Sequence, residues 1–142
     1  MITFNLEYFL KLLHALYTHQ NKDDKFSRLM TFDDFRRIGL STNSNGNIQD
    51  YFVYHLQMVQ NENLVCTFRQ DRETRAKKIY FGLTEKGYAM CDALFEKGAR
   101  EFLLNLGTNV NFAVCQKACS AIGSDIIFSE TKSAFWQDSC HC

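Results

Sequence analysis

Five basic residues lie close together in one polar stretch of the chain, and their charge suits contact with phosphate. Only two acidic residues, Asp71 and Glu73, share the stretch from 69 to 78 with them. Cationic side chains that neutralise phosphates release counterions, which supplies most of the nonspecific affinity for nucleic acid. The candidate phosphate contacts are Arg69, Arg72, Arg75, Lys77 and Lys78. A charged turn that is simply solvated explains the same composition about equally well.

Amide side chains upstream of this stretch have the chemistry to recognise base edges. Asparagine and glutamine can hydrogen-bond bidentately to adenine. The candidates for base contact, with one tyrosine among them, are Asn45, Asn47, Gln49, Tyr54 and Gln57.

The same upstream region has no fixed positive charge of its own. No lysine or arginine occurs between Arg37 and Arg69, whereas Asp50 and Glu62 are both present. Because each missing cation removes a phosphate contact, this region is a poor DNA-binding surface by itself. Several side chains here are expected to be exposed and suit a protein partner equally well, since aromatic residues and methionine are enriched at protein interfaces. They are Tyr51, Tyr54, His55 and Met58.

The cysteines admit two interpretations, a zinc site and buried free thiols. Cys115 and Cys119 stand one helical turn apart, and Cys140, His141 and Cys142 add soft ligands at the end of the chain. Four such ligands can close a tetrahedral zinc site. Paired CxxC motifs are absent, however, and Cys115 falls on an apolar stripe where a free thiol behaves as a small hydrophobic residue. We therefore expect structural thiols and predict no metal and no cofactor.

Catalytic motifs are absent from the sequence. It contains no glycine-rich phosphate loop, no nucleophile elbow and no histidine pair with a nearby glutamate at metalloenzyme spacing. The sequence therefore predicts a protein that is not an enzyme.

The residues that could contact nucleic acid are positioned by a predicted helix followed by a hairpin. Apolar residues at three- and four-residue steps predict one buried stripe on a helix over 48–63, formed by Ile48, Phe52, Val53, Leu56 and Val59. Alternating residues after Asn63 then predict a strand with Leu64, Cys66 and Phe68 on one face. A second strand is expected over 79–83, so the basic stretch becomes a solvent-exposed connection, or wing.

A further helix is expected directly after the hairpin. Thr84 is a good N-cap, because its hydroxyl can accept a hydrogen bond from the first helical turn. Gly87 allows close approach to a neighbouring strand or helix, because it has no Cβ. Helical spacing continues to about residue 106, and Gly98 predicts a break or bend within it.

Four further elements are expected elsewhere in the chain. A wide apolar stripe predicts a helix over 5–19, and residues 28–30 could form a short strand. Thr31 and Asp34 form a capping box at the start of a helix that ends at Gly39, with Phe32, Phe35 and Ile38 along one side. A final helix is expected over about 111–122.

Two segments of this pattern resemble a known family: Leu64-Val65, which leads into the hairpin, and the run Leu83-Thr84-Glu85-Lys86-Gly87-Tyr88. They resemble winged-helix regulators of the MarR and PadR kind, which often carry a leucine-threonine-x-x-glycine turn after the wing. Two others are similar to a small group of uncharacterised phage and bacterial winged-helix proteins: Tyr54-His55-Leu56-Gln57-Met58-Val59 and Gly87-Tyr88-Ala89-Met90. The resemblance covers roughly residues 30–94 and is more specific for fold than for function.

The resemblance implies how the elements would be used. In winged-helix domains the second helix of the pair, here 48–63, enters the major groove, and the wing, here 69–78, touches the DNA backbone. Such regulators commonly form homodimers, and the apolar first and last helices are candidates for that contact.

Composition limits the remaining possibilities. The chain has 142 residues, 46% of them hydrophobic, and no proline, which suits one domain over 1–128 with a tail over 129–142. A formal net charge of zero gives no global attraction to nucleic acid or to a membrane. No apolar run is long enough to span a bilayer, and the first residues do not form a signal peptide pattern. We therefore expect a cytoplasmic location with reduced thiols.

Together these observations predict a mainly α, α+β fold: a winged helix-turn-helix with a small β-hairpin wing and additional C-terminal helices. The predicted function is that of a small regulator that binds double-stranded DNA. The alternative is a winged-helix protein-interaction module, encoded by a phage or mobile element, that binds and modulates a host protein complex.

Overall fold

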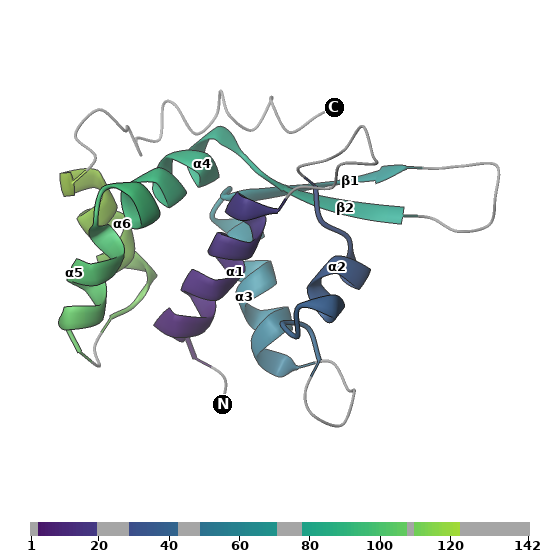
Figure 1. Ribbon diagram of the computed structural model, residues 1–142, viewed down its shortest axis with the longest axis horizontal. Helices are drawn as coiled ribbons and strands as arrows, with labels where there is room; N and C mark the ends of the chain where they lie inside the picture. The colour runs from purple at the N-terminus through teal and green to yellow at the C-terminus, as the bar shows by residue number, and fades with distance from the viewer. Residues whose placement is uncertain (1–2, 20–28, 43–48, 71–77, 108–109, 123–142) are drawn as a thin grey trace.

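The fold is mainly helical with a small antiparallel hairpin, which confirms the predicted α+β class (Figure 1). The computed structural model describes residues 3–19, 29–42, 49–70, 78–107 and 110–122, and the side chains of all of these except 68–70 and 78. The elements in chain order are α1 (Leu6–Thr18), α2 (Phe32–Arg37), α3 (Asp50–Asn61), β1 (Val65–Gln70), β2 (Lys78–Leu83), α4 (Glu85–Cys91), the π-helix η1 (Asp92–Glu96), α5 (Ala99–Asn105) and α6 (Phe112–Ile122).

Helix α1 is the centre of the core. The side chain of Asn5 caps it by accepting a hydrogen bond from the Tyr8 backbone N–H at 2.9 Å. Its apolar stripe packs against α3, α4 and β2 and buries five side chains, Phe9, Leu10, Leu12, Leu13 and Leu16. The first helix predicted from periodicity is therefore confirmed, and its apolar stripe is used within the chain itself.

Helix α2 begins with the predicted capping box. The Asp34 backbone N–H donates to Thr31 Oγ1, and Asp34 Oδ2 accepts from the Thr31 backbone N–H at 2.9 Å. After the helix, Gly39 has a φ of +78°, which glycine adopts without steric cost. Only Phe35 of the predicted apolar side is buried, because this six-residue helix meets the core along a narrow face; Phe32 is 47% exposed and Ile38 is 54% exposed.

The stripe predicted for α3 is confirmed at Phe52, Leu56 and Val59, which are all buried. The prediction was wrong for Val53, which is 42% exposed. Adjacent helical residues are separated by about 100° around the axis, so Val53 turns away from the face that Phe52 occupies. Ile48 lies outside the described residues. The helix itself is shorter at each end than the predicted 48–63.

The hairpin pairs β1 with β2 from Val65↔Leu83 to Gln70↔Lys78. The predicted strand around 28–30 is limited to a single bridge between Met30 and Phe81 among the residues that are described. The predicted alternation was wrong at its start, because Leu64 and Val65 are both buried. Leu64 belongs to the turn that closes α3, where its backbone N–H donates to the Val59 carbonyl at 2.9 Å, so the alternation begins only after it.

The start of α4 follows the predicted chemistry. Thr84 Oγ1 accepts from the Gly87 backbone N–H at 3.0 Å and donates to the Asn63 carbonyl at 2.6 Å. A Cβ at Gly87 would lie 2.1 Å from the Leu64 carbonyl oxygen, so only glycine permits this approach. The hydrogen bonds of Thr84 and the close approach at Gly87 thus position the start of α4 against the turn between α3 and the hairpin.

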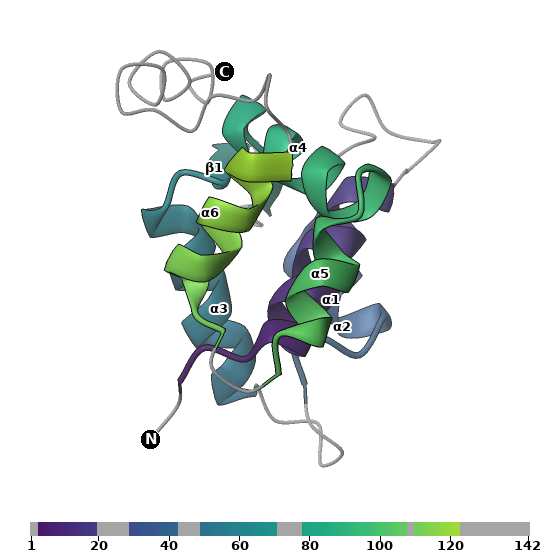
Figure 2. The ribbon, with the colours of Figure 1, turned by 90° about the vertical axis from the view of Figure 1, so that its left-hand side faces the viewer.

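The helical region predicted over 84–106 is divided into α4, η1 and α5. The break falls at Gly98, whose φ is +89°, as the sequence predicted. Helices α5 and α6 then pack together at the end of the molecule opposite the hairpin (Figures 1 and 2). Among the described residues, no helix combines the length and apolar character needed to cross a membrane. The tail predicted over 129–142 lies outside the described residues.

Candidate functional site

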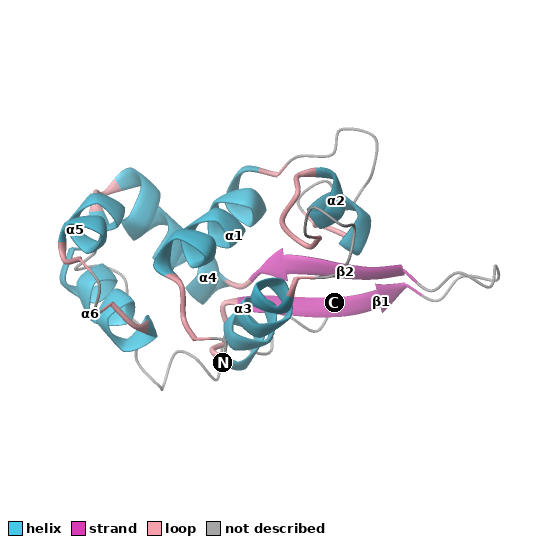
Figure 3. Ribbon diagram, turned by 90° about the horizontal axis from the view of Figure 1, so that it is seen from below, coloured by secondary structure: helices cyan, strands magenta, loops and turns pink. Residues whose placement is uncertain are grey.

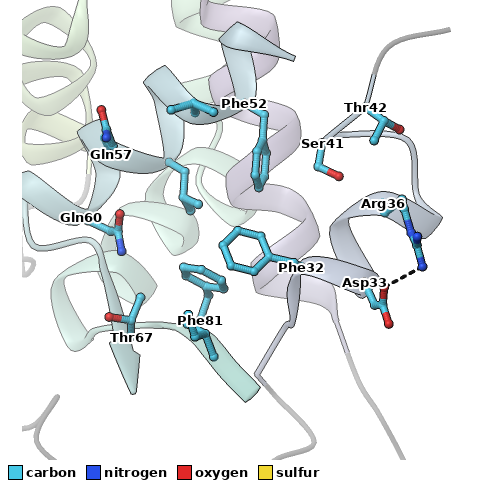
Figure 4. A pocket seen from close by; sticks show the side chains of 13 residues that line it. Phe32, Asp33, Arg36, Ser41, Thr42, Phe52, Gln57, Gln60, Thr67 and Phe81 are labelled. Carbon is cyan, nitrogen blue, oxygen red and sulfur yellow. Dashed lines mark hydrogen bonds and ion pairs between the residues drawn. The ribbon is translucent and has the colours of Figure 1, made fainter. Parts of the chain in front are cut away.

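A groove of about 660 Å³ opens between α2, α3 and the hairpin. Figure 3 shows these three elements together, away from α5 and α6. The groove has an aromatic floor and a polar rim (Figure 4). Its lining residues are Phe32, Asp33, Arg36, Ser41, Thr42, Phe52, Val53, Leu56, Gln57, Gln60, Thr67, Ile79 and Phe81.

The floor is built from phenylalanine rings that come from three elements. The ring centroid of Phe32 lies 4.9 Å from that of Phe81 in an edge-to-face arrangement and 6.3 Å from that of Phe52. Beneath them the fully buried Phe35 contacts both Phe52 and Phe81. Such pairs are favourable at these separations, so the floor is a packed and preformed surface.

The rim of the groove carries polar side chains that are free to bind a partner. Gln57 and Gln60 stand three residues apart on α3, and Thr67 lies across from them on β1. Figure 4 shows the two amides on one side of Phe32 and the Asp33–Arg36 pair on the other. Within the described part of the chain, the side chains of Gln57, Gln60 and Thr67 make no hydrogen bond. This rim therefore offers donors and acceptors to a partner.

Ion pairs within the chain neutralise the arginines of α2. Arg36 Nη2 lies 2.6 Å from Asp33 Oδ1, and Arg37 Nη2 lies 3.1 Å from Asp34 Oδ1. Both arginines are largely exposed, so these pairs are weak and salt-sensitive. Since each arginine of α2 is paired with an aspartate of the same helix, α2 contributes no net positive charge.

A third cation near α3 has a structural role. Lys86 is buried, and its Nζ donates to the Glu62 carbonyl at 3.1 Å, at the C-terminal end of α3. Burial lowers the pKa of this ammonium group. Lys86 therefore holds α4 to the end of α3 and is unavailable to an external phosphate.

The structure separates the predicted base-contacting residues into different environments. Gln57 faces the groove, as a contact residue should. Gln49 instead has a structural role, because its Nε2 donates to the Thr42 carbonyl at 2.6 Å just before α3. Tyr54 is half-buried with its ring edge-to-face against His55 at 5.0 Å. Asn45 and Asn47 lie outside the described residues.

Of the five predicted phosphate contacts, only Arg69 and Lys78 belong to the described strands. Arg69 pairs with Ile79 in the strand register, and Lys78 pairs with Gln70 at its last position. Nothing is described of either side chain. Arg72, Arg75 and Lys77 lie outside the described residues, in the segment that joins the two strands.

The structure contradicts the prediction that His55 is exposed. Its exposed fraction is 0%, and its Nε2 accepts a hydrogen bond from the Asn5 backbone N–H at 2.9 Å. Nδ1 must then carry the proton, and it lies 2.7 Å from the Tyr51 carbonyl. Burial lowers the pKa of the imidazole, so the ring is neutral. The signal was present in the sequence, since His55 stands three residues after Phe52 and one before Leu56, within the buried stripe.

Three of the four described cysteines belong to the core, whereas Cys66 on β1 is half-buried. Cys91, Cys115 and Cys119 are fully buried. Burial raises the pKa of Cys91 above its usual range and raises those of Cys115 and Cys119 to about 12, so all three remain protonated thiols. Among the described residues, no group of three or more His, Cys, Asp or Glu side chains could hold a metal ion. The other predicted candidates, Cys140, His141 and Cys142, lie outside those residues.

Comparison of the chain with protein-family models, with curated proteins and with solved structures finds no match. Function must therefore be argued from the geometry of the groove and its charge.

Proposed function

We propose that this protein is a winged helix-turn-helix protein that binds duplex DNA, with α3 in the major groove and the hairpin against the backbone. The observation that carries the proposal is the open face shared by α3 and the hairpin. Gln57 of α3 and Thr67 of β1 line the same groove. A duplex that rests on the outer side of α3 would therefore meet the hairpin as well.

The outer side of α3 has the chemistry for base contact. Gln57 is exposed, and Gln60 follows it on the same side of the helix, one turn along. Neither amide is engaged within the described residues, so each is free to bond bidentately to adenine. Val53 is also exposed there and can contact a thymine methyl group.

Phosphate affinity must come mainly from the hairpin end. Helix α3 has no Lys or Arg, and its first residue, the exposed Asp50, would repel the DNA backbone. The stretch from 69 to 78 carries five basic and two acidic residues. Binding should therefore depend strongly on those basic residues and on salt.

Fluorescence anisotropy with mixed-sequence duplex DNA across a salt series tests this proposal. We expect the wild-type protein to bind, and Arg72→Ala/Arg75→Ala/Lys77→Ala to bind more weakly. The plot of log affinity against log salt should become shallower by about 0.9 for each phosphate that the variant no longer neutralises. The matched control, Lys11→Ala/Lys97→Ala/Lys117→Ala, removes the same charge from positions outside the hairpin and should bind like the wild type. The absence of binding even at low salt would refute the proposal.

A second candidate function is binding to another protein through the same face. The observation that favours it is the combination of exposed Phe32 and Val53 with a charge-poor α3. Aromatic groups at the centre of a patch and a shortage of charge there are typical of protein interfaces. Failure of DNA binding together with capture of one defined host protein, abolished by Val53→Arg, would establish this function instead.

We also propose that the protein forms a homodimer. The proposed contact is made by α5, and not by the first and last helices that the sequence suggested. The apolar stripe of α1 is buried in its own chain, and Cys115, Ala118 and Cys119 of α6 are buried as well. Helix α5 instead exposes Phe102 and, one turn later, the adjoining Leu106. An apolar pair of this kind supports a contact through α5. Sedimentation equilibrium should therefore show a dimer for the wild type and a monomer for Phe102→Glu.

A further inference from the structure

Strand β1 is an edge strand whose outer side is open for pairing. The described strands form a two-stranded sheet, and the register between β1 and β2 runs without a bulge. Figure 3 shows β2 between β1 and α2, so that β1 forms the far border of the hairpin. Among the described residues, no strand pairs with that border.

The ladder determines which backbone groups of β1 point outward. Phe81 exchanges both of its backbone hydrogen bonds with Met30, each at 2.8 Å, so its N–H and C=O point away from β1. Thr67 is the partner of Phe81 in the register, which makes the two a non-hydrogen-bonded pair of the antiparallel ladder. The N–H and C=O of Thr67 therefore point to the outer side. Because orientation repeats every two residues along a strand, those of Arg69 point outward as well.

The accessible part of this outer edge begins at Thr67. Thr67 is exposed, whereas Val65, the preceding residue with the same orientation, is only 4% exposed. On the outer side, no backbone hydrogen bond joins Thr67 or Arg69 to another described residue. An unpaired strand edge is a template for an added strand unless charge, proline or a bulge prevents it. The chain has no proline, and the register has no bulge, so only charge can control pairing here.

The charge of this edge favours one kind of added strand. Residues 65–70 include Arg69 and no acidic residue, and the stretch 69–78 carries five basic and two acidic residues. Opposite charges on neighbouring strands stabilise their pairing, whereas like charges opposite one another destabilise it. A second copy of the chain would bring two hairpins of the same charge sign together. An acidic strand is therefore the complementary partner.

We propose that an extended acidic segment of a partner protein binds to the outer edge of β1 and adds a strand to the sheet. Backbone hydrogen bonds to Thr67 and Arg69 provide the pairing. Carboxylates of the segment complement the positive charge of Arg69, and threonine suits the position opposite Thr67. The inference does not depend on DNA binding, because it concerns backbone groups of β1 and not the outer side of α3.

The first test measures the fluorescence anisotropy of a labelled peptide, Asp-Glu-Val-Thr-Val-Glu-Asp, titrated with the whole chain at low salt. We expect saturable binding to the wild type. Thr67→Pro removes the outward N–H, which takes no part in the ladder with β2, and should weaken binding about tenfold. The matched control, Thr67→Val, keeps the N–H and a β-branched side chain and should bind within about threefold of the wild type.

A modified peptide tests the pairing without any change to the protein. N-methylation of its three central residues keeps every charge and side chain but prevents backbone pairing along either edge of the peptide. Its affinity for the wild type should therefore be lower by about tenfold or more. Hydrogen exchange provides a local measurement. The Thr67 amide should become protected when the unmodified peptide binds, whereas the Phe68 amide, which belongs to the ladder, should be protected throughout.

Three results would overturn the proposal. The first is no saturable binding of the unmodified peptide, or equal binding of the methylated peptide, since charge attraction alone would then explain the signal. The second is unchanged exchange at Thr67 while the peptide is bound, which would place the peptide elsewhere. The third is self-association of the wild type without peptide, abolished by Thr67→Pro, which would make a second copy the occupant of the edge.

Discussion

The two sides of α3 differ in how their polar groups are used. On the inner side, both ring nitrogens of His55 are engaged, one with the Asn5 backbone N–H and one with the Tyr51 carbonyl. On the outer side, the amides of Gln57 and Gln60 have no hydrogen-bond partner among the described residues. The inner polar group positions the helix, since an unmet hydrogen bond there would be costly. The outer groups lose nothing while they face water and are free to bind a partner.

The largest difference in the free energy of unfolding is expected when one polar residue on each side of α3 is replaced by leucine. His55→Leu keeps much of the side-chain volume and leaves the Asn5 N–H without its acceptor, so we expect a loss of about 2 kcal/mol in the free energy of unfolding. Gln57→Leu, two residues away, should change it by less than about 0.5 kcal/mol. Urea denaturation of both variants provides the measurement. Equal losses would show that the two sides do not differ in this way.

Acidification should destabilise the wild-type protein through His55 on the inner side of α3. Burial lowers the pKa of His55 below its ordinary value of 6.5, and a second ring proton would displace the Asn5 hydrogen bond. The unfolded chain therefore binds more protons, so this stabilisation is complete above about pH 6.5 and is lost as pH falls below it. Urea midpoints between pH 7.5 and 5.5 should fall in the wild type and less in His55→Gln. The control, His14→Gln at an exposed position on α1, should follow the wild type.

A smaller effect is expected at Lys86, which holds α4 to the end of α3. Lys86→Met keeps the apolar stem and removes the hydrogen bond to the Glu62 carbonyl, so we expect a loss of about 1 kcal/mol in thermal or urea unfolding. DNA affinity at one fixed salt concentration should remain unchanged. A marked drop in DNA affinity of the folded variant would show that this buried cation does contribute to binding.

The outer amides should affect binding and leave stability unchanged. In Gln57→Ala/Gln60→Ala the free energy of unfolding should stay within about 0.5 kcal/mol of the wild type. Each bidentate amide contributes about 1–3 kcal/mol of discrimination between bases, so the double variant should bind different duplex sequences with nearly equal affinity. Retained sequence preference would assign base recognition to another surface.

Local signals in the sequence predicted most of the elements. The Thr31–Asp34 capping box, the Thr84 cap and the glycines at 87 and 98 each depend on a few neighbouring residues, and each is found where the sequence placed it. Alternation and helical periodicity also gave the order of α3, β1 and β2 correctly. These features are readable because the backbone groups within one or two turns decide them.

Features that depend on tertiary packing were harder to predict from the sequence. Val53 is as apolar as its buried neighbours and is nevertheless exposed, because only the direction of the α1 contact decides which residues face inward. The burial of His55 follows from its place in the helical stripe, but its hydrogen-bond partner does not, because the Asn5 backbone N–H lies fifty residues earlier and no local pattern encodes that contact. Similarly, the aromatic groove combines Phe32, Phe52 and Phe81 from three elements, so it emerges only when α2, α3 and the hairpin are assembled.

The most direct test of the central claim is a backbone amide NMR titration of the ¹⁵N-labelled protein with duplex DNA at low salt. We predict that the shifts change along α3, around Gln57 and Gln60, and along the hairpin, whereas the amides of α5 and α6 stay constant. Changes confined to α5 and α6, or no change at all, would contradict the claim that the outer side of α3 and the hairpin form the DNA-binding face.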